Sequence, residues 1–259
     1  MENETKLSGM QSRTELLLGT AGVERLQQAK VIIFGLGGVG SWCAEALVRS
    51  GVRRLTIVDS DRICVSNCNR QLMATSRTVG QVKVEALRDR LLDINPDATI
   101  TACQKIYSAE SAEDFHLEEY DYVVDAIDSL GDKADLILRA TALPKTVTFV
   151  SSMGAALRRD PFMVRKAEFW KVQGDPLARA LRNTFKRHKM MPRRKFMCVY
   201  SEEPPLKNLG ANEAPDGQQQ TEPVGSSVKV QVNGSLCHIT AIFGMAIAGI
   251  IINHIVDNA

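Results

Sequence analysis

The chain has 259 residues, of which 32 are Lys or Arg and 30 are Asp or Glu, so its formal net charge is only +2. Such a balance favours no charged partner by itself, and a nucleic-acid site would have to come from local clustering. The apolar fraction of 44% is ordinary for a globular protein with a sizeable core. The length fits one large α/β domain or a domain with a substantial extension.

The six cysteines include no C-x-x-C pair, which argues against a structural zinc site. Their scatter along a chain of this size indicates reduced thiols rather than a disulfide framework. The first ten residues, "MENETKLSGM", are polar and of mixed charge, unlike a secretory signal. We therefore expect a cytoplasmic protein.

The first half of the chain alternates between predicted strands and helices. Apolar runs predict strands at 31–34, 54–61, 99–104, 120–129 and 146–156. Helical periodicity predicts helices at 41–49, 81–95 and 132–143. Because such alternation implies parallel strands joined by right-handed crossovers, we expect an α/β protein with a Rossmann-like, doubly wound and mainly parallel sheet.

The second half has a different pattern. A helix is predicted from Pro176 with Asp175 as its N-cap, then a mobile loop at 206–227 and a strand at 228–232. Residues 239–252 are uncharged, but a span needs about 20 apolar residues, so we expect a core or dimer-interface helix, with membrane association the minority alternative. We divide the chain into a core at 1–155, which contains the alternating strands and helices, and a C-terminal extension at 156–259, integrated with the same domain.

A glycine-rich loop follows the first strand in "VIIFGLGGVGSW". Gly35, Gly37 and Gly40 have the spacing G-x-G-x-x-G, which lets a backbone approach phosphates at the entry to a helix. Asp59 ends the second strand nineteen residues after Gly40, where a carboxylate would bind ribose hydroxyls. The sequence therefore predicts a nucleotide site, although tight packing of the helix on the strand would need the same glycines.

Charged residues after Asp59 favour ATP over NAD. A nicotinamide site has no need to neutralise a triphosphate, yet Arg70 and Lys83 each supply a cation near the expected phosphates. Asp128 follows the fourth strand, where ligands bind in doubly wound sheets, and could hold Mg²⁺ against phosphate oxygens. Each charge alone is more often a solvated surface group, but together they predict an ATP-Mg²⁺ site.

Five stretches, "GLGGVGSW", "DSD", "NCNRQ", "VGQVK" and "DAIDS", resemble in order and spacing the adenylating domain of the ubiquitin-activating-enzyme superfamily. Its bacterial members activate carboxylates on sulfur-carrier proteins. The resemblance implies ATP as the nucleotide, Mg²⁺ positioned by Asp128, and catalytic roles for Arg70, Lys83 and Asp128. It also implies a nucleotide-binding set of Gly35, Gly37, Gly38, Gly40, Asp59, Asp61, Asn67, Arg70, Gln71 and Lys83.

Upstream, "SRTELLLG" resembles the N-terminal helix of this superfamily, whose arginine reaches the ATP of the other protomer. The likeness implies that Arg13 is a further catalytic residue and that the protein is a homodimer. Judged locally, Arg13 is a solvated helix charge.

The second half resembles a narrower family, the tRNA threonylcarbamoyladenosine dehydratases, in "SSMGA", "GDPLARALR", "CVYSEEP" and "FGMAIAG". The C-x-x-C pairs that usually bind zinc in the carrier-activating branch are absent from the sequence. The resemblance implies an ATP-dependent ligase or cyclase that adenylates the carboxylate of threonylcarbamoyladenosine in tRNA and dehydrates it to a ring. The alternative is an adenylyltransferase that activates the C-terminal Gly-Gly of a small sulfur-carrier protein, and a binding scaffold or an NAD dehydrogenase is less favoured.

An acid-free stretch between Pro176 and Ser201 supports a nucleic-acid substrate independently. Clustered cations of this density bind phosphate backbones by counterion release, although charge runs are usually solvated faces. We expect tRNA rather than DNA, bound by Arg179, Arg182, Lys186, Arg187, Lys189, Arg193, Arg194 and Lys195.

Cys198 follows the basic stretch and would suit a reactive thiol there, but free cysteines are more often buried packing residues. A catalytic role for Cys198 or Cys237, and the need for a sulfur-transfer partner, stay open at this point.

Overall fold

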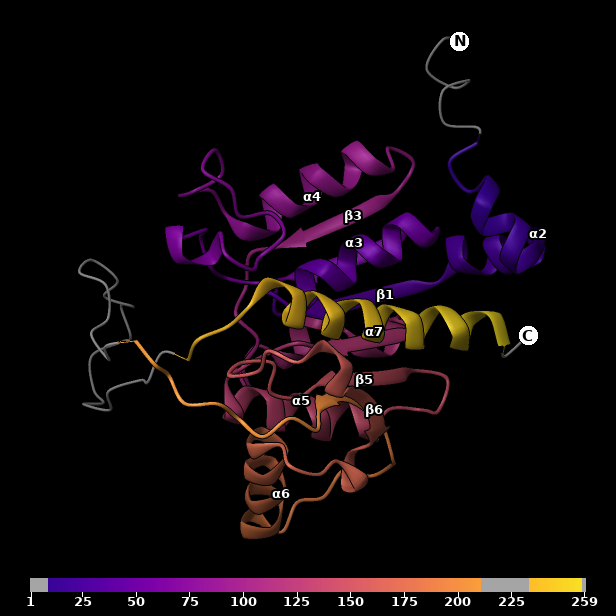
Figure 1. The fold of residues 1–259 in the computed structure, drawn as a ribbon. Helices are drawn as coiled ribbons and strands as arrows, with labels where there is room; N and C mark the ends of the chain where they lie inside the picture. The colour runs from indigo at the N-terminus through magenta and orange to yellow at the C-terminus, as the bar shows by residue number, and fades with distance from the viewer. Residues whose placement is uncertain (1–8, 211–232, 258–259) are drawn as a thin grey trace.

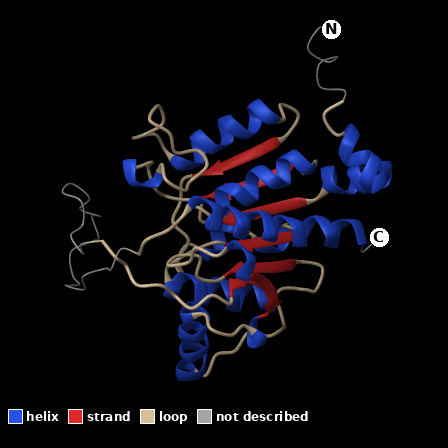
Figure 2. Cartoon of the chain, in the orientation of Figure 1, coloured by secondary structure: helices blue, strands red, loops and turns tan. Residues whose placement is uncertain are grey.

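The computed structural model describes residues 9–210 and 233–257. Within them, seven strands form one sheet in the order β3-β2-β1-β4-β5-β7-β6, and every neighbouring pair is parallel except the antiparallel pair β7 and β6 (Figures 1 and 2). The strands are β1 (Lys30–Phe34), β2 (Arg54–Val58), β3 (Thr99–Cys103), β4 (Tyr122–Asp125), β5 (Thr148–Ser152), β6 (Val164–Glu168) and β7 (Met197–Ser201).

Helices cover both faces of the sheet. Those longer than one turn are α2 (Ser12–Gln28), α3 (Gly40–Ser50), α4 (Lys83–Ile94), α5 (Leu130–Ala142), α6 (Pro176–His188) and α7 (Cys237–Asp257). Successive side chains of a strand point to opposite faces, so β1 contributes to two cores. Val31 and Ile33 pack in the core that includes side chains of α3, α4 and α7, whereas Ile32 and Phe34 pack in the core of α5 and α6.

The predicted sheet and its flanking helices are confirmed. All five predicted strands and the three helices of the first half occur, although β2 ends at Val58, just before Asp59. Helix α6 begins at Pro176, and the Asp175 side chain accepts a hydrogen bond from the Ala178 backbone N at 2.8 Å, as an N-cap does. The predicted strand at 228–232 and most of the loop at 206–227 lie outside the described residues.

Two strands were missed by the sequence analysis. β7 extends the parallel sheet beside β5, and β6 pairs antiparallel with β7 at the edge of the sheet. β6 exposes Arg165 and Lys166, and charged side chains of this kind protect an edge strand from pairing with another chain. Both strands come from the region predicted as the extension, and the boundary at residue 155 stays a prediction.

Helix α7 is, among the described helices, the one that is long and apolar enough to cross a membrane by length and composition. Ile239, Phe243, Ile247 and Ile251 on this helix are fully buried, in the same core as Cys43 and Leu47 of α3. α7 lies along α3 in Figure 1, across the face of the sheet. This packing is that of the expected core helix.

Candidate active site

The strand order reverses direction between β1 and β4. From β1 the chain builds the sheet outward through β2 and β3, and from β4 it builds in the opposite direction through β5. In such sheets ligands bind at the carboxyl ends of the strands beside this switch point. The glycine loop after β1, Asp59 after β2 and Asp128 after β4 all lie at that edge.

The glycine loop has little room for side chains except at one position. Gly35 has φ +85°, and a Cβ atom there would lie 2.6 Å from the Ala126 carbonyl oxygen. A Cβ atom on Gly40 would lie 1.9 Å from the Gly35 oxygen, whereas one on Gly37 would meet nothing within 4 Å. The loop thus leaves open space at Gly37, next to the start of α3, where backbone N–H groups and the helix dipole favour phosphate.

Asp59 and Lys83 form the second part of the site. Asp59 Oδ2 accepts a hydrogen bond from the Leu36 backbone N at 2.7 Å, and Oδ1 accepts one from the Asp61 N at 2.9 Å. Lys83 Nζ lies 2.8 Å from Asp61 Oδ2 and 3.8 Å from Asp59 Oδ1. Asp59 therefore also holds the glycine loop, and the almost fully buried Lys83 is a cation fixed beside that loop.

The segment after β2 brings Arg70 to the same edge. Burial lowers the pKa of the Arg70 guanidinium, and attraction by the Asp128 carboxylate opposes that shift. Arg70 and Asp128 are therefore close enough to interact, although 58 positions separate them in the sequence. Asn67 uses its side chain to close its own turn, and Gln71 is buried behind the segment.

Two residues that the sequence analysis did not assign connect these parts. Ser41 Oγ donates to the Gly37 oxygen at 2.7 Å and accepts from the Leu72 N at 3.2 Å. Trp42 Nε1 donates to the Arg70 carbonyl oxygen at 3.0 Å. The first turn of α3 thereby ties the glycine loop to the Arg70 segment. Their place directly after the last glycine of "GLGGVGSW" was the available signal.

A fully buried ion pair supports the turn that carries Asp128. Lys133 Nζ lies 2.8 Å from Asp125 Oδ2, both side chains are 0% exposed, and Lys133 also donates to the Ile127 carbonyl oxygen at 2.9 Å. Ser151 Oγ on β5 donates to Asp125 Oδ2 at 2.6 Å, and the Ile127 N donates to Oδ1 at 3.1 Å. The network fixes the chain just before the exposed Asp128 at the end of β4.

A metal at this site would depend on its nucleotide. The described residues contain no group of three or more His, Cys, Asp or Glu side chains that could hold a metal ion. Mg²⁺ usually needs only one or two carboxylates, because phosphates and water complete its octahedron. An exposed Asp128 beside a phosphate loop fits such a site.

The basic stretch divides into two kinds of cation. Arg182 donates to the carbonyl oxygens of Phe169 and Val172, and its guanidinium lies 5.3 Å from the centre of the Phe169 ring. Arg194 donates to three carbonyl oxygens around the C-terminus of α5, and burial lowers the pKa of its guanidinium. The other six cations are exposed: Arg179, Lys186, Arg187, Lys189, Arg193 and Lys195.

Cys198 does not have the setting of a reactive thiol. It is 0% exposed, and burial raises the pKa of its thiol well above the usual value. Cys237, at the start of α7, is exposed. The structure thus gives Cys198 a packing role.

Arg13 lies in the first turn of α2 and is exposed. Leu16 and Leu17 on the same helix are 88% and 83% exposed. Large exposed apolar side chains next to each other are typical of interaction surfaces.

Comparisons with known proteins show the family of the chain. The model of the ThiF family matches residues 11–258. The tRNA threonylcarbamoyladenosine dehydratase of Bacillus subtilis (strain 168) is 36% identical over 230 residues, which are 86% of this chain and 89% of that protein. The enzyme of the same name from Haemophilus influenzae is 37% identical over 85% of this chain and 83% of its own. The chain belongs to the ThiF family of ubiquitin-activating-like proteins, and these high-coverage relatives within it are tRNA threonylcarbamoyladenosine dehydratases.

Solved structures of an enzyme with the same name are also similar to this chain. The Escherichia coli tRNA N6-threonylcarbamoyladenosine dehydratase in complex with AMP matches with a TM-score of 0.80 and 30% identity over 95% of this chain and 94% of that one. The ATP complex of that enzyme matches with a TM-score of 0.80 and 28% identity, over 96% and 94%. ATP is thus bound in a homologous structure.

Proposed function

We propose that this protein uses ATP to dehydrate threonylcarbamoyladenosine in tRNA, closing a ring on the modified base. The observation that carries the proposal is the meeting of an open phosphate loop, two cations and a carboxylate at one edge of the sheet, in a chain with a largely exposed basic stretch. The names of the high-coverage relatives support it.

The first step forms an acyl-adenylate. A carboxylate oxygen of the threonyl group attacks the α-phosphorus of ATP, and pyrophosphate leaves. The α-phosphate lies over the loop at Gly37, and Arg70 and Lys83 stabilise the negative charge that develops on the phosphoryl oxygens. Ion pairs with Asp59 and Asp61 hold the Lys83 ammonium in place, so we assign it the role of a fixed cation.

The second step closes the ring. The carbamoyl group of the same substituent attacks the activated carbonyl carbon, loses a proton, and AMP leaves with the former carboxylate oxygen. The substituent has then lost one water in total. Because the nucleophile is tethered to its target, it reacts at high effective molarity and no covalent enzyme intermediate is needed. A buried Cys198 agrees with this route.

Asp128 would hold Mg²⁺ with phosphate oxygens and water as the remaining ligands. The metal would neutralise charge on the phosphates. The buried network of Asp125 and Lys133 fixes the chain just before the exposed Asp128, which supports this proposal.

The exposed cations of the basic stretch contact the tRNA backbone. Arg182 and Arg194 are excluded from this role because their guanidinium groups are committed to backbone carbonyl oxygens. We assign the phosphate contacts to the six exposed cations, Arg179, Lys186, Arg187, Lys189, Arg193 and Lys195.

Arg13 would act on the ATP of a second protomer in a homodimer. The exposed Leu16 and Leu17 beside it supply an apolar contact for such a partner. The protein would work in the cytoplasm, and a sulfur-transfer partner is not required by the steps above.

The test is incubation with ATP, Mg²⁺ and tRNA carrying threonylcarbamoyladenosine, followed by mild digestion and mass spectrometry of the nucleosides. The expected product is lighter by one water, with AMP and pyrophosphate released. Asp128→Ala should abolish the product, whereas Cys198→Ala should retain most of it. If the nucleoside stays unchanged and a carrier protein ending in Gly-Gly becomes adenylated instead, the proposal is replaced by the carrier-activating alternative.

A further inference from the structure

A groove of about 220 Å³ runs between α5 and α6, on the face of the sheet opposite α7. Ala134 and Leu138 of α5 line one wall, and Thr184 and His188 of α6 line the other. The mouth includes Met190, which is 52% exposed. The groove is therefore mainly apolar, with an imidazole and a thioether at its open side.

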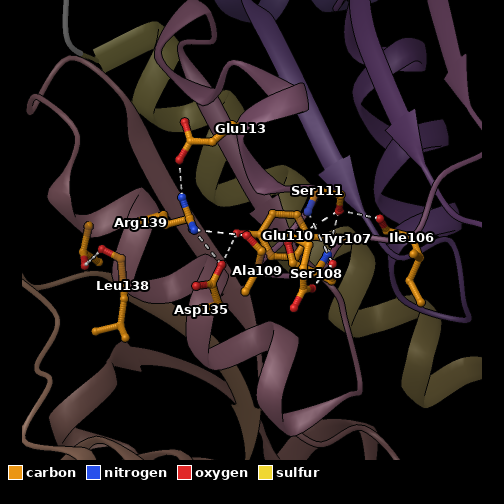
Figure 3. A network of polar contacts seen from close by, with 11 residues as sticks. Ile106, Tyr107, Ser108, Ala109, Glu110, Ser111, Glu113, Asp135, Leu138 and Arg139 are labelled. Carbon is orange, nitrogen blue, oxygen red and sulfur yellow. Dashed lines mark hydrogen bonds and ion pairs between the residues drawn. The ribbon is translucent and has the colours of Figure 1, made fainter.

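The groove contains one anionic group whose orientation is fixed. Asp135 lines it, and Asp135 Oδ2 accepts hydrogen bonds from the Tyr107 hydroxyl and from Arg139 Nε, both at 2.8 Å. Figure 3 shows Arg139 between Asp135 and Glu113, to which it is also paired. Both bonds use Oδ2, so in the described part of the chain Oδ1 keeps its lone pairs available as acceptors.

Exposed cations lie next to the groove in the sequence. Lys186, Arg187 and Lys189 surround His188 at the end of α6, Arg193 follows, and all four are exposed. Acidic residues are absent from the sequence between 176 and 201. An apolar slot close to clustered cations is complementary to one base of a single-stranded nucleic acid, whose charge is on its backbone and whose faces are apolar.

The groove also begins close to the reaction site. Gly131, which lines its upper end, lies in the first turn of α5, three residues after Asp128. Three residues of chain span at most about 11 Å, so the groove starts within roughly that distance of Asp128. A nucleotide that places its substituent at the adenylating site therefore brings an adjacent nucleotide within reach of the groove.

We propose that the α5–α6 groove binds an unstacked nucleobase of the substrate RNA that neighbours the modified adenosine, with Asp135 accepting a hydrogen bond from an exocyclic amino group. This inference rests on the proposed function. Enzymes that act on a base take it out of the stack, and the exposed neighbours need their own binding surface. Since Asp135 accepts only, we expect the groove to prefer a base with an exocyclic amino group over uracil, which can offer only its ring N3–H.

Two variants fill the groove from opposite walls. Gly131→Leu adds a side chain where a Cβ atom meets nothing within 4 Å, and Thr184→Phe adds a ring from α6. The matched control is Asn183→Phe, which places the same ring on an exposed position of α6 that does not line the groove. ATP binding and the melting temperature of each variant establish that the fold and the nucleotide site are intact.

The assay measures binding and cyclisation of an RNA stem-loop that carries threonylcarbamoyladenosine in its loop. Each groove variant should weaken binding by about tenfold without changing its salt dependence, because stacking rather than phosphate contact is lost. An RNA with abasic nucleotides on both sides of the modified adenosine should lose affinity for the unmodified protein and for Asn183→Phe. Gly131→Leu should bind this abasic RNA as tightly as it binds the intact RNA, because the substitution and the missing bases remove the same contact.

The specificity is tested with RNAs that differ only in the neighbouring bases. Replacement of an amino-bearing neighbour by uracil should weaken binding to the unmodified protein, and Asp135→Asn should reduce that difference. The base-binding proposal is refuted if the unmodified protein cyclises the RNA and the groove variants bind that RNA as tightly as the unmodified protein does. It is also refuted if the loss of affinity from the abasic nucleotides adds in full to the loss from the groove substitution. If the unmodified protein neither binds nor cyclises the RNA, the proposed function fails and the groove assignment fails with it.

Discussion

Replacement of Lys133 by Met should destabilise the protein strongly although Lys133 touches no solvent and no expected ligand. Met has a similar length, so the change removes the charge and leaves little cavity. Asp125 then keeps a buried negative charge with only two of its hydrogen bonds, from Ser151 Oγ and the Ile127 N. Both side chains of the ion pair are 0% exposed, so water cannot replace the ammonium.

Loss of one partner of a buried pair costs about 3–5 kcal/mol, because the remaining charge is uncompensated. For a chain of this size each kcal/mol lowers the melting temperature by about 2–4 °C, so the expected decrease is roughly 6–20 °C. The double variant Lys133→Met with Asp125→Asn should recover part of the loss, because the Asn side chain is neutral. Its Oδ1 still accepts from the Ile127 N, and its Nδ2, in the place of Oδ2, can donate to Ser151 Oγ.

Thermal and urea unfolding, followed by circular dichroism, measure this effect. The control is Arg88→Met, which breaks an ion pair with Asp89 whose side chains are 38% and 67% exposed and should cost less than about 1 kcal/mol. AMP formation should also fall in Lys133→Met below the unfolding temperature, since Ile127 lies in the turn that leads to Asp128. An unfolding free energy for Lys133→Met equal to that of the control would refute the reasoning.

Four further predictions concern reactivity, charge, assembly and pH. In the native protein a thiol reagent should modify the exposed Cys64, Cys68 and Cys237, whereas the buried Cys198 should react only after unfolding. Modification of native Cys198 as fast as the exposed cysteines would contradict its burial. A variant with Ala at four exposed positions of the basic stretch, Lys186, Arg187, Lys189 and Arg193, should lower the slope of log affinity for tRNA against log salt concentration by roughly 3. Its ATP binding should stay unchanged. An unaltered slope would place the RNA contacts elsewhere. Mixtures of inactive Arg13→Ala and Asp128→Ala proteins should regain some activity under subunit exchange, because one site of a mixed dimer is complete, and mixtures that stay inactive despite exchange would exclude action of Arg13 in trans. Burial raises the pKa of the Glu45 carboxyl, but hydrogen bonds from Arg90 and Arg49 outweigh this effect and leave the pKa below its usual 4.5. The ionised Glu45 therefore stabilises the fold above pH 4.5, and this stabilisation is lost as the pH falls through the lowered pKa. Glu45→Gln should therefore be less stable than the unmodified protein at pH 7 and differ less from it at pH 3 in urea unfolding.

Local patterns in the sequence were sufficient for much of the fold and for the centre of the site. The apolar runs of β1 and β4, the glycine spacing between Gly35 and Gly40 and the N-cap at Asp175 each depend on residues a few positions apart. Periodicity, φ preferences and capping act over that range, so they can be recognised without a structure. The charges Arg70, Lys83 and Asp128 could be assigned to one site because the carboxyl ends of parallel strands meet at the same edge.

Only the tertiary structure decided which partner each polar or apolar side chain has. β6 and β7 are neighbours in the sheet although 28 residues separate their ends, and the charged β6 carries no apolar alternation that would indicate a strand. Arg182 and Arg194 look like the other cations of their stretch, yet they bind carbonyl oxygens from distant segments. Lys133 and Cys198 are fully buried, one paired with Asp125 and the other packed as an apolar residue. Burial and pairing depend on contacts between remote parts of the chain, whose energies a local pattern does not contain.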